Sequence, residues 1–228
     1  MGTFEKVTAA DGHELQAYVA QPKGELRGAL VVVPEIFGVN AHIRSVVDLY
    51  AAHGYLAVAP ATFDRIERGV ELRYEGEDLK KAFEMYGKLS PDTALLDVAA
   101  AFQHVRGNHR TAVMGFCYGG LMAWLSATRA PALGIEPVCT VGYYAGGIGH
   151  FAAEEPTCPV MLHFGAEDDH IGAEQVDAVK QAHPDVQVFV YEGAGHAFNR
   201  DVVPAVYRAE AAKLAQERTL KFLAEHVG

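Results

Sequence analysis

Six short apolar runs recur along this chain and constrain its fold more than any other feature. They cover residues 29–33, 55–59, 111–116, 138–143, 159–164 and 186–191, and prolines or glycines bound them. Their hydrophobicity is continuous and not alternating, which is typical of strands covered on both faces, as in a parallel sheet. The sequence therefore predicts a buried sheet of mostly parallel strands.

Segments with helical spacing lie between these runs. Two helical faces stand out, formed by Ile43, Val46, Val47 and Tyr50 and by Leu95, Val98, Ala99 and Phe102. Ser90 and Pro91 predict the N-cap and first turn of the second helix, and Gly107 predicts its end. Because strands and helices alternate, we expect an α/β fold with a mostly parallel central sheet and helices on both faces.

A hairpin and a helix are predicted at the two ends of the chain. Residues 4–8 and 14–20, on either side of the Asp11-Gly12 turn signal, predict an antiparallel hairpin at the amino-terminal edge of the sheet. A last helix is predicted over residues 204–225, with Tyr207, Ala211 and Leu214 facing inward. The chain has no internal repeat, low-complexity tract or linker, so residues 1–228 are predicted to form a single domain.

Composition excludes several classes of function. With 19 basic and 29 acidic residues, the net charge of −10 disfavours nucleic acid and membrane surfaces as partners. The amino terminus lacks the pattern of a signal peptide and no apolar run is long enough to span a membrane, so we expect a cytoplasmic protein. The three cysteines show no CxxC spacing, and no metal site or cofactor is predicted.

One of the cysteines has a reactive context. Residues 115–120 read GFCYGG, a G-x-nucleophile-x-G elbow with Cys117 where serine is usual, directly after one apolar run and before a helical segment. The tight turn between strand and helix needs small neighbours, and the helix amino terminus stabilises negative charge on the sulfur. Cys117 is the predicted nucleophile, whereas Cys139 and Cys158 are predicted to be part of the packing.

A nucleophile of this fold needs an acid and a histidine, in that chain order. Asp168 follows the run 159–164, with the adjacent Asp169 as an alternative, and His196 follows the run 186–191 in a loop of small residues. Both positions are strand ends. Glu35 lies at another strand end, where the fold supplies an oxyanion-hole N–H, and from the residues alone it is a carboxylate of unknown role or a solvated loop glutamate.

Four motifs together resemble the dienelactone hydrolase (carboxymethylenebutenolidase) family. They are PEIFGVN at 34–40, GFCYGG at 115–120, VGYY at 141–144 and GHAF at 195–198, and the similarity spans nearly the whole chain. The resemblance implies an α/β-hydrolase fold, a triad of Cys117, Asp168 and His196, and an oxyanion hole from the backbone N–H groups of Ile36 and Tyr118. It also implies that Glu35 contacts the resting thiol and helps to deprotonate it.

The resemblance also implies a substrate that carries a free carboxylate, held by arginines. Arg200 occupies one such position, and the second cation is expected within the charged segment 64–88, a predicted part of a lid, where Arg65, Arg68, Arg73, Lys80 and Lys81 are all alternatives. Aromatic residues near strand ends are predicted to line the pocket: Phe37, Tyr144 and Phe198, with Trp124 and Tyr143 as further candidates.

The predicted function is therefore the opening of small anionic lactones or esters through an acyl-enzyme intermediate. The alternatives are the same triad acting on another ester or thioester, and a non-catalytic redox-sensing or ligand-binding protein that uses Cys117 as a reactive thiol. A monomer is expected, with a homodimer as the alternative.

Overall fold

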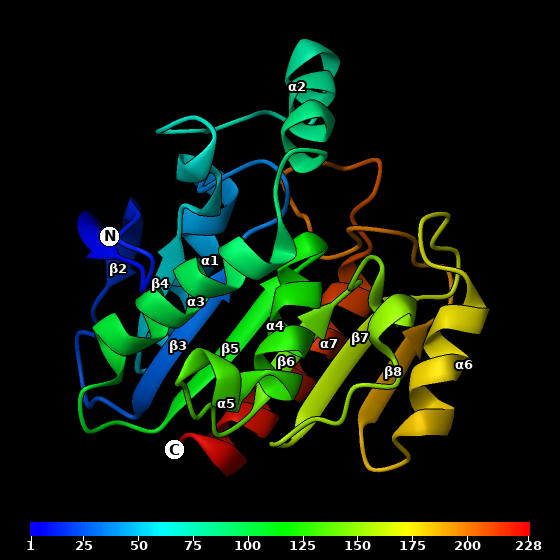
Figure 1. Ribbon diagram of the computed structural model, residues 1–228. Coiled ribbons are helices and arrows are strands. Elements are labelled where there is room, and N and C mark those ends of the chain that lie inside the picture. Colours follow the sequence, from blue (N-terminus) through cyan, green and yellow to red (C-terminus); the bar gives the residue numbers. More distant parts are fainter.

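Eight strands form one continuous sheet in the computed structural model, which describes all 228 residues (Figure 1). Their spatial order is β1-β2-β4-β3-β5-β6-β7-β8. The strands are β1 (Thr3–Thr8), β2 (Glu14–Ala20), β3 (Gly28–Val33), β4 (Tyr55–Pro60), β5 (Thr111–Phe116), β6 (Thr140–Tyr143), β7 (Val160–Gly165) and β8 (Gln187–Tyr191). Each predicted run therefore forms a strand, within two residues of its predicted bounds.

Strand direction follows the prediction. The six strands from β3 to β8 are mutually parallel, and β2 pairs antiparallel with both β1 and β4. Every residue of β3, β5 and β7 is buried, which explains why these strands are continuously apolar. The central parallel sheet and the antiparallel amino-terminal hairpin are confirmed.

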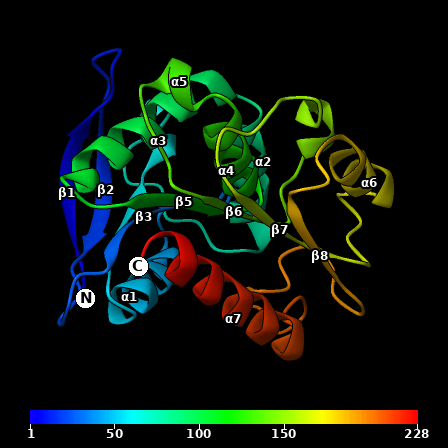
Figure 2. The same cartoon turned by 90° about the horizontal axis from the view of Figure 1, so that it is seen from below.

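Helices cover both faces of the sheet (Figure 2). One face carries α1 (Ala41–Ala52) and α7 (Ala209–His226), and the other carries α3 (Pro91–Arg106), α4 (Tyr118–Thr128) and the short α5 (Ala130–Leu133). The remaining helices are α2 (Gly76–Tyr86), α6 (Ala173–Ala182) and the 3-10 turns η1 (Thr62–Arg65) and η2 (Ile148–Phe151). None of these helices is long and apolar enough to cross a lipid bilayer.

Helix ends are confirmed in part. Helix α3 starts at Pro91 and ends before Gly107, as predicted, although the side chain of Ser90 makes no capping hydrogen bond. Helix α1 is capped by Asn40, whose Oδ1 accepts a hydrogen bond from the N–H of Ile43 at 3.2 Å.

The last helix is shorter than predicted. It begins at Ala209 instead of residue 204, because residues 204–206 form a turn and the N–H of Arg208 donates to the carbonyl of Phe198 at 3.0 Å. The prediction that Leu214 faces inward is wrong, since this side chain is 41% exposed. Ala211 is buried as predicted, and the buried side of α7 also includes Ala212, Ala215, Thr219 and Phe222.

The charged segment 64–88 rises above the carboxyl ends of the strands (Figure 1). Its longest regular element is α2, whose Ala82 and Met85 are buried against the body of the protein. A parallel sheet binds ligands beyond the carboxyl ends of its strands, so α2 stands where a covering element is needed.

Candidate active site

Cys117 lies on a strained turn between β5 and α4. Its backbone has φ 54° and ψ −117°, outside the regions that a side chain prefers, and its N–H donates to the carbonyl of Tyr143 at 2.9 Å. A Cβ on Gly115 would run into the backbone of Gly119, and one on Gly119 would run into the carbonyl of Val33. The flanking glycines are therefore a steric requirement of the elbow.

His196 and Asp168 form the second part of the site. The Nδ1 atom of His196 lies 2.8 Å from Oδ2 of Asp168, and Oδ1 of Asp168 accepts hydrogen bonds from the N–H groups of His170 (2.9 Å) and Ile171 (3.1 Å). The alternative acid, Asp169, points to solvent with 84% of its side chain exposed. Asp168 is therefore the carboxylate that orients His196.

The environment of His196 favours its charged form. Burial alone would lower the pKa of His196, but the hydrogen bond with Asp168 and the nearby Cys117 sulfur outweigh it and raise the pKa to about 10. The imidazole thus lies between the carboxylate and the sulfur, in the order that proton transfer from a thiol requires.

Glu35 is paired with Arg200 and makes no hydrogen bond to Cys117. Arg200 donates from Nη2 to Oε1 of Glu35 at 2.8 Å and from Nε to Oε2 at 3.1 Å, and both residues are buried. The resemblance implied that Glu35 contacts the resting thiol. In this structure both carboxylate oxygens are instead occupied by one guanidinium, which is the geometry that Arg and carboxylate prefer.

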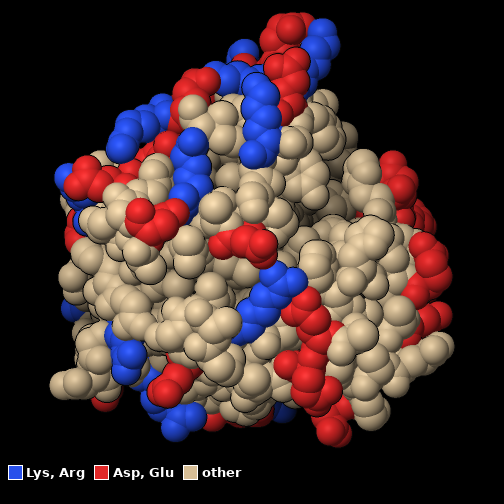
Figure 3. Space-filling view, in the orientation of Figure 1, with Lys and Arg blue, Asp and Glu red and all other residues tan.

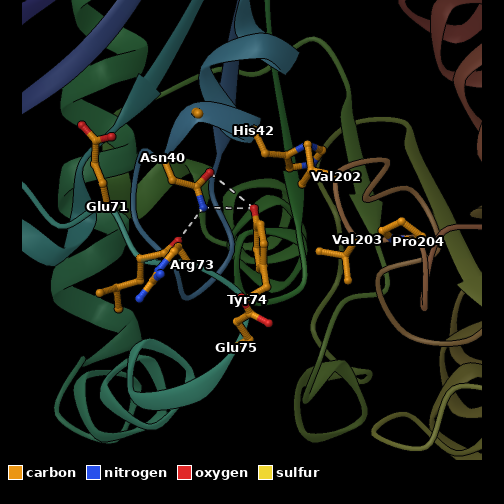
Figure 4. A pocket seen from close by; sticks show the side chains of 11 residues that line it. Asn40, His42, Glu71, Arg73, Tyr74, Glu75, Val202, Val203 and Pro204 are labelled. Carbon is orange, nitrogen blue, oxygen red and sulfur yellow. Dashed lines mark hydrogen bonds between the residues drawn. The ribbon is translucent and has the colours of Figure 1, made fainter.

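A second layer holds this ion pair in place. The guanidinium of Arg200 stacks 4.1 Å from the ring centre of Tyr74 and 5.2 Å from that of Phe37. Asn40 donates from Nδ2 to the hydroxyl of Tyr74 and to the carbonyl of Leu72, both at 3.0 Å (Figure 4). Asn40 therefore links the start of α1 to the segment that covers Arg200.

A pocket of about 290 Å³ opens beside the sulfur of Cys117. Its lining comprises Ile36, Phe37, Leu79, Phe83, Tyr86, Cys117, Tyr118, Gly146, Gly147, His170, His196 and Arg200. The N–H of Ile36 has no acceptor within the chain, and the N–H of Tyr118 is the first of α4, where helical acceptors are lacking. The predicted oxyanion residues and Phe37 thus lie around the same pocket as Cys117.

Two predicted substrate contacts lie outside this pocket. Tyr144 and Phe198 are fully buried, with ring centres 5.5 Å apart, and Tyr144 packs 5.1 Å from the ring of His196. Tyr144 packs against the histidine, Phe198 packs against Tyr144, and neither residue lines the cavity. Trp124 and Tyr143 are also core residues. The indole N–H of Trp124 donates a hydrogen bond to the carbonyl of Phe151, and the hydroxyl of Tyr143 is hydrogen-bonded to that of Thr219.

The five candidate cations of segment 64–88 all have partners outside the pocket. Arg65 bridges Asp11 and Asp97, Arg68 donates to the carbonyl of Glu14, and Arg73, Lys80 and Lys81 pair with Asp78, Glu77 and Glu67. Lysines and arginines alternate with acidic residues around the protruding helix (Figure 3). None of the five lines the pocket, so Arg200 is its only arginine or lysine.

Leu79, Phe83 and Tyr86 of α2 were not predicted as site residues. Their spacing of four and three residues places them on one helical face, and this apolar spacing is the sequence signal that identifies them. The structure also contains no cluster of three or more His, Cys, Asp or Glu side chains arranged for a metal ion.

The sheet order and the position of the cysteine elbow define this protein as an α/β-hydrolase. The family model described as the dienelactone hydrolase family matches residues 15–227. This chain belongs to the dienelactone hydrolase family and is a hydrolase of that type.

Individual relatives agree with this assignment. The carboxymethylenebutenolidases of Pseudomonas putida and Pseudomonas knackmussii are each 32% identical over 228 residues, which cover 96% of this chain and 94% of theirs. A crystal structure from Klebsiella pneumoniae, assigned to the dienelactone hydrolases, superposes with a TM-score of 0.83 at 30% identity and covers 99% of both chains.

Proposed function

We propose that this protein hydrolyses small lactones or esters through a Cys117–His196–Asp168 triad and an acyl-enzyme intermediate. The observation that carries the proposal is the placement of Cys117, the His196–Asp168 pair and two oxyanion N–H donors around one small pocket. Such an arrangement supplies the nucleophile, the proton carrier and the charge stabilisation that acyl transfer needs.

The first half of the reaction forms the acyl-enzyme. The Cys117 sulfur, its proton passed to His196, attacks the carbonyl carbon, and the resulting oxyanion accepts hydrogen bonds from the N–H groups of Ile36 and Tyr118. The tetrahedral adduct collapses with cleavage of the ester C–O bond. His196 returns its proton to the departing oxygen, so a thioester and an alcohol are formed, or one ring-opened thioester from a lactone.

The second half uses His196 as a base. Asp168 and Cys117 together raise the pKa of this histidine to about 10, against the effect of burial. A thioester sulfur carries no negative charge, so acylation removes the contribution of Cys117 and lowers the pKa of His196. The neutral imidazole then accepts a proton from water, which attacks the thioester, and the carboxylic acid leaves with cleavage of the C–S bond.

Substitution of Cys117 tests the proposal. We expect Cys117→Ala to lower kcat on an activated ester by more than about 10³-fold, whereas Cys158→Ala, a half-buried cysteine outside the pocket, should retain activity. Full activity of the Cys117→Ala variant would contradict the proposal. The redox-sensing alternative predicts no turnover by the unmodified protein.

Two further predictions from the sequence, on location and oligomeric state, are part of this proposal. They are the cytoplasmic location and a monomeric state, with a homodimer as the alternative. Cell fractionation and size-exclusion chromatography test them.

A further inference from the structure

A second histidine, His170, lies beside the histidine of the triad. It lines the same pocket as Cys117, and its ring meets the ring of His196 edge-on, with ring centres 4.9 Å apart and an interplanar angle of 83°. The N–H of His170 donates to Oδ1 of Asp168, whose other oxygen contacts His196. One carboxylate therefore fixes the backbone of the first histidine and the ring of the second, although no step of the proposed reaction uses His170.

The ring nitrogens of His170 make no hydrogen bond within the protein. Nε2 lies 3.6 Å from Oδ1 of Asp169, which is beyond hydrogen-bond range, and the two side chains are 58% and 84% exposed. An ion pair as exposed as this one is worth at most about 1 kcal/mol. The imidazole is therefore available to donate a hydrogen bond to a bound substrate.

The proposed reaction determines which part of a substrate lies next to His170. His196 returns a proton to the departing oxygen, so the alcohol portion of the ester lies against His196. In a lactone, the same place is taken by the ring oxygen and the carbon that carries it. Because His170 packs on the ring of His196 in the same pocket, a substituent on the alcohol portion is brought to His170.

Few residues of the pocket can carry a positive charge. Arg200 lines it, and its pairing with Glu35 uses Nε and Nη2, so Nη1 makes no hydrogen bond within the protein. The five candidate cations of segment 64–88 do not line the pocket. Apart from Arg200 and the triad residue His196, His170 is the only pocket residue whose side chain can become a cation.

We propose that His170, in its protonated form, binds a carboxylate on the alcohol portion of the substrate together with Arg200. The inference rests on the proposed hydrolase function, and it assigns the second cation to the loop after β7 instead of to segment 64–88. Histidine is the side chain that ordinarily gains its charge between about pH 8 and pH 5. The preference for anionic substrates should therefore increase as the pH falls.

The neighbouring ionisable groups do not produce the same pH dependence. Those that face His170 or share its pocket are Tyr86, Cys117, Tyr118, Asp168, Asp169, His196 and Arg200. The cysteine and histidine of the triad act on every ester, so their ionisation cancels in the ratio of two matched esters. Arginine stays charged and aspartates are ordinarily ionised above about pH 5, and burial raises the pKa of both tyrosines. A ratio that changes with pH therefore reports on His170.

A pair of matched esters tests the proposal. The probe 4-acetoxybenzoate carries a carboxylate on its alcohol portion, and 4-acetoxybenzamide replaces it with a neutral amide of similar size. In the wild type, we expect the ratio of kcat/KM for the benzoate to that for the benzamide to rise about 10-fold from about pH 8 to about pH 5.5, the effect of one charge-assisted hydrogen bond. His170→Gln should keep the ratio constant. His53→Gln changes an exposed histidine outside the pocket and is the control, with the ratio of the wild type at each pH.

A permanent cation at the same position provides the complementary test. His170→Arg should give a high ratio at both pH values, because its charge does not titrate. A wild-type ratio that does not change with pH, a rise that persists in His170→Gln, or a low ratio in folded His170→Arg would overturn the inference. Hydrolysis of the benzamide that depends on Cys117 would leave the hydrolase proposal intact in each case, whereas hydrolysis of neither ester would overturn both. If His170→Arg does not fold, the comparison of the wild type with His170→Gln decides.

Discussion

The carboxylate of Glu35 and the guanidinium of Arg200 form a bidentate ion pair at the edge of the pocket, with N–O distances of 2.8 and 3.1 Å. The two residues are separated by 165 positions in the chain. Their pairing compensates a buried positive charge with a buried negative one, and Glu35 makes no hydrogen bond to the Cys117 thiol. The pair therefore influences the stability of the fold.

Loss of one partner of this pair should destabilise the fold. Removing one charge of a buried pair typically costs about 3–5 kcal/mol, because the other charge stays buried and unpaired. We expect Glu35→Gln to lower the free energy of unfolding by an amount of this order in urea denaturation. The double variant Glu35→Leu/Arg200→Met should lose less than the sum of its single changes. Glu77→Gln, which breaks an exposed pair with Lys80, is the control and should change stability by less than about 1 kcal/mol. Additive losses would contradict direct coupling.

The two adjacent aspartates should differ sharply in their effect on catalysis. Asp168 orients His196, so Asp168→Asn should lower kcat by about 10⁴-fold, as expected when the histidine loses its charged partner and its tautomer changes. Asp169→Asn alters an exposed side chain one residue away and should leave kcat nearly unchanged. Steady-state kinetics of both variants on one ester provides the measurement, and similar losses would refute the assignment.

Stability should decrease with rising pH because of His196. Its pKa is raised from 6.5 to about 10 in the folded protein, so the protonated form is stabilised by folding. This contribution is complete below about pH 6.5 and is lost as pH rises toward 10. Unfolding free energies of the wild type and His196→Gln, measured from pH 6 to 10, should therefore converge. The buried cysteines and tyrosines titrate in both proteins and cancel in the comparison. A constant difference across this range would contradict the assigned environment.

The elbow should not tolerate a methyl group at Gly119. A Cβ at this position would overlap the backbone carbonyls of Val33 and Pro34. We expect Gly119→Ala to lose at least about 1–3 kcal/mol of stability, the usual cost of overpacking, together with most activity. Gly24 has no atom within 4 Å of its ideal Cβ and a φ outside the left-handed region, so Gly24→Ala is the control and should stay within about 0.5 kcal/mol of the wild type. Thermal melts of the two variants distinguish these outcomes.

Local patterns explain what the sequence could predict. Continuous apolar runs identify β3 to β8 because both faces of these strands are buried, and Cys117, Asp168 and His196 follow strand ends that meet at one edge of the sheet. The order of residues in the chain alone leaves Asp169 as an alternative to Asp168 for the carboxylate that orients His196. The contact of Asp168 with His196 and its hydrogen bonds from the N–H groups of His170 and Ile171 resolve the choice.

The sequence could not predict side-chain orientations that depend on contacts between segments distant in the chain. Tyr144 and Ala197 have φ of 36° and 60°, and these turns direct Tyr144 and Phe198 into the core instead of the pocket. The pairing of Glu35 with Arg200 depends on the approach of distant loops. The spacing of Leu79, Phe83 and Tyr86 in the sequence indicates an apolar face on α2. No neighbouring residue indicates that this face, and not the charged one, is turned toward Cys117.

The most direct test of the central claim is the mass of the enzyme during turnover. The wild type should be mixed with 4-nitrophenyl hexanoate, quenched in acid within milliseconds and analysed intact and as peptides. We predict one added hexanoyl group, located on Cys117 and absent from Cys117→Ala. Turnover without an acyl group on Cys117, combined with sustained activity of Cys117→Ala, would contradict the account.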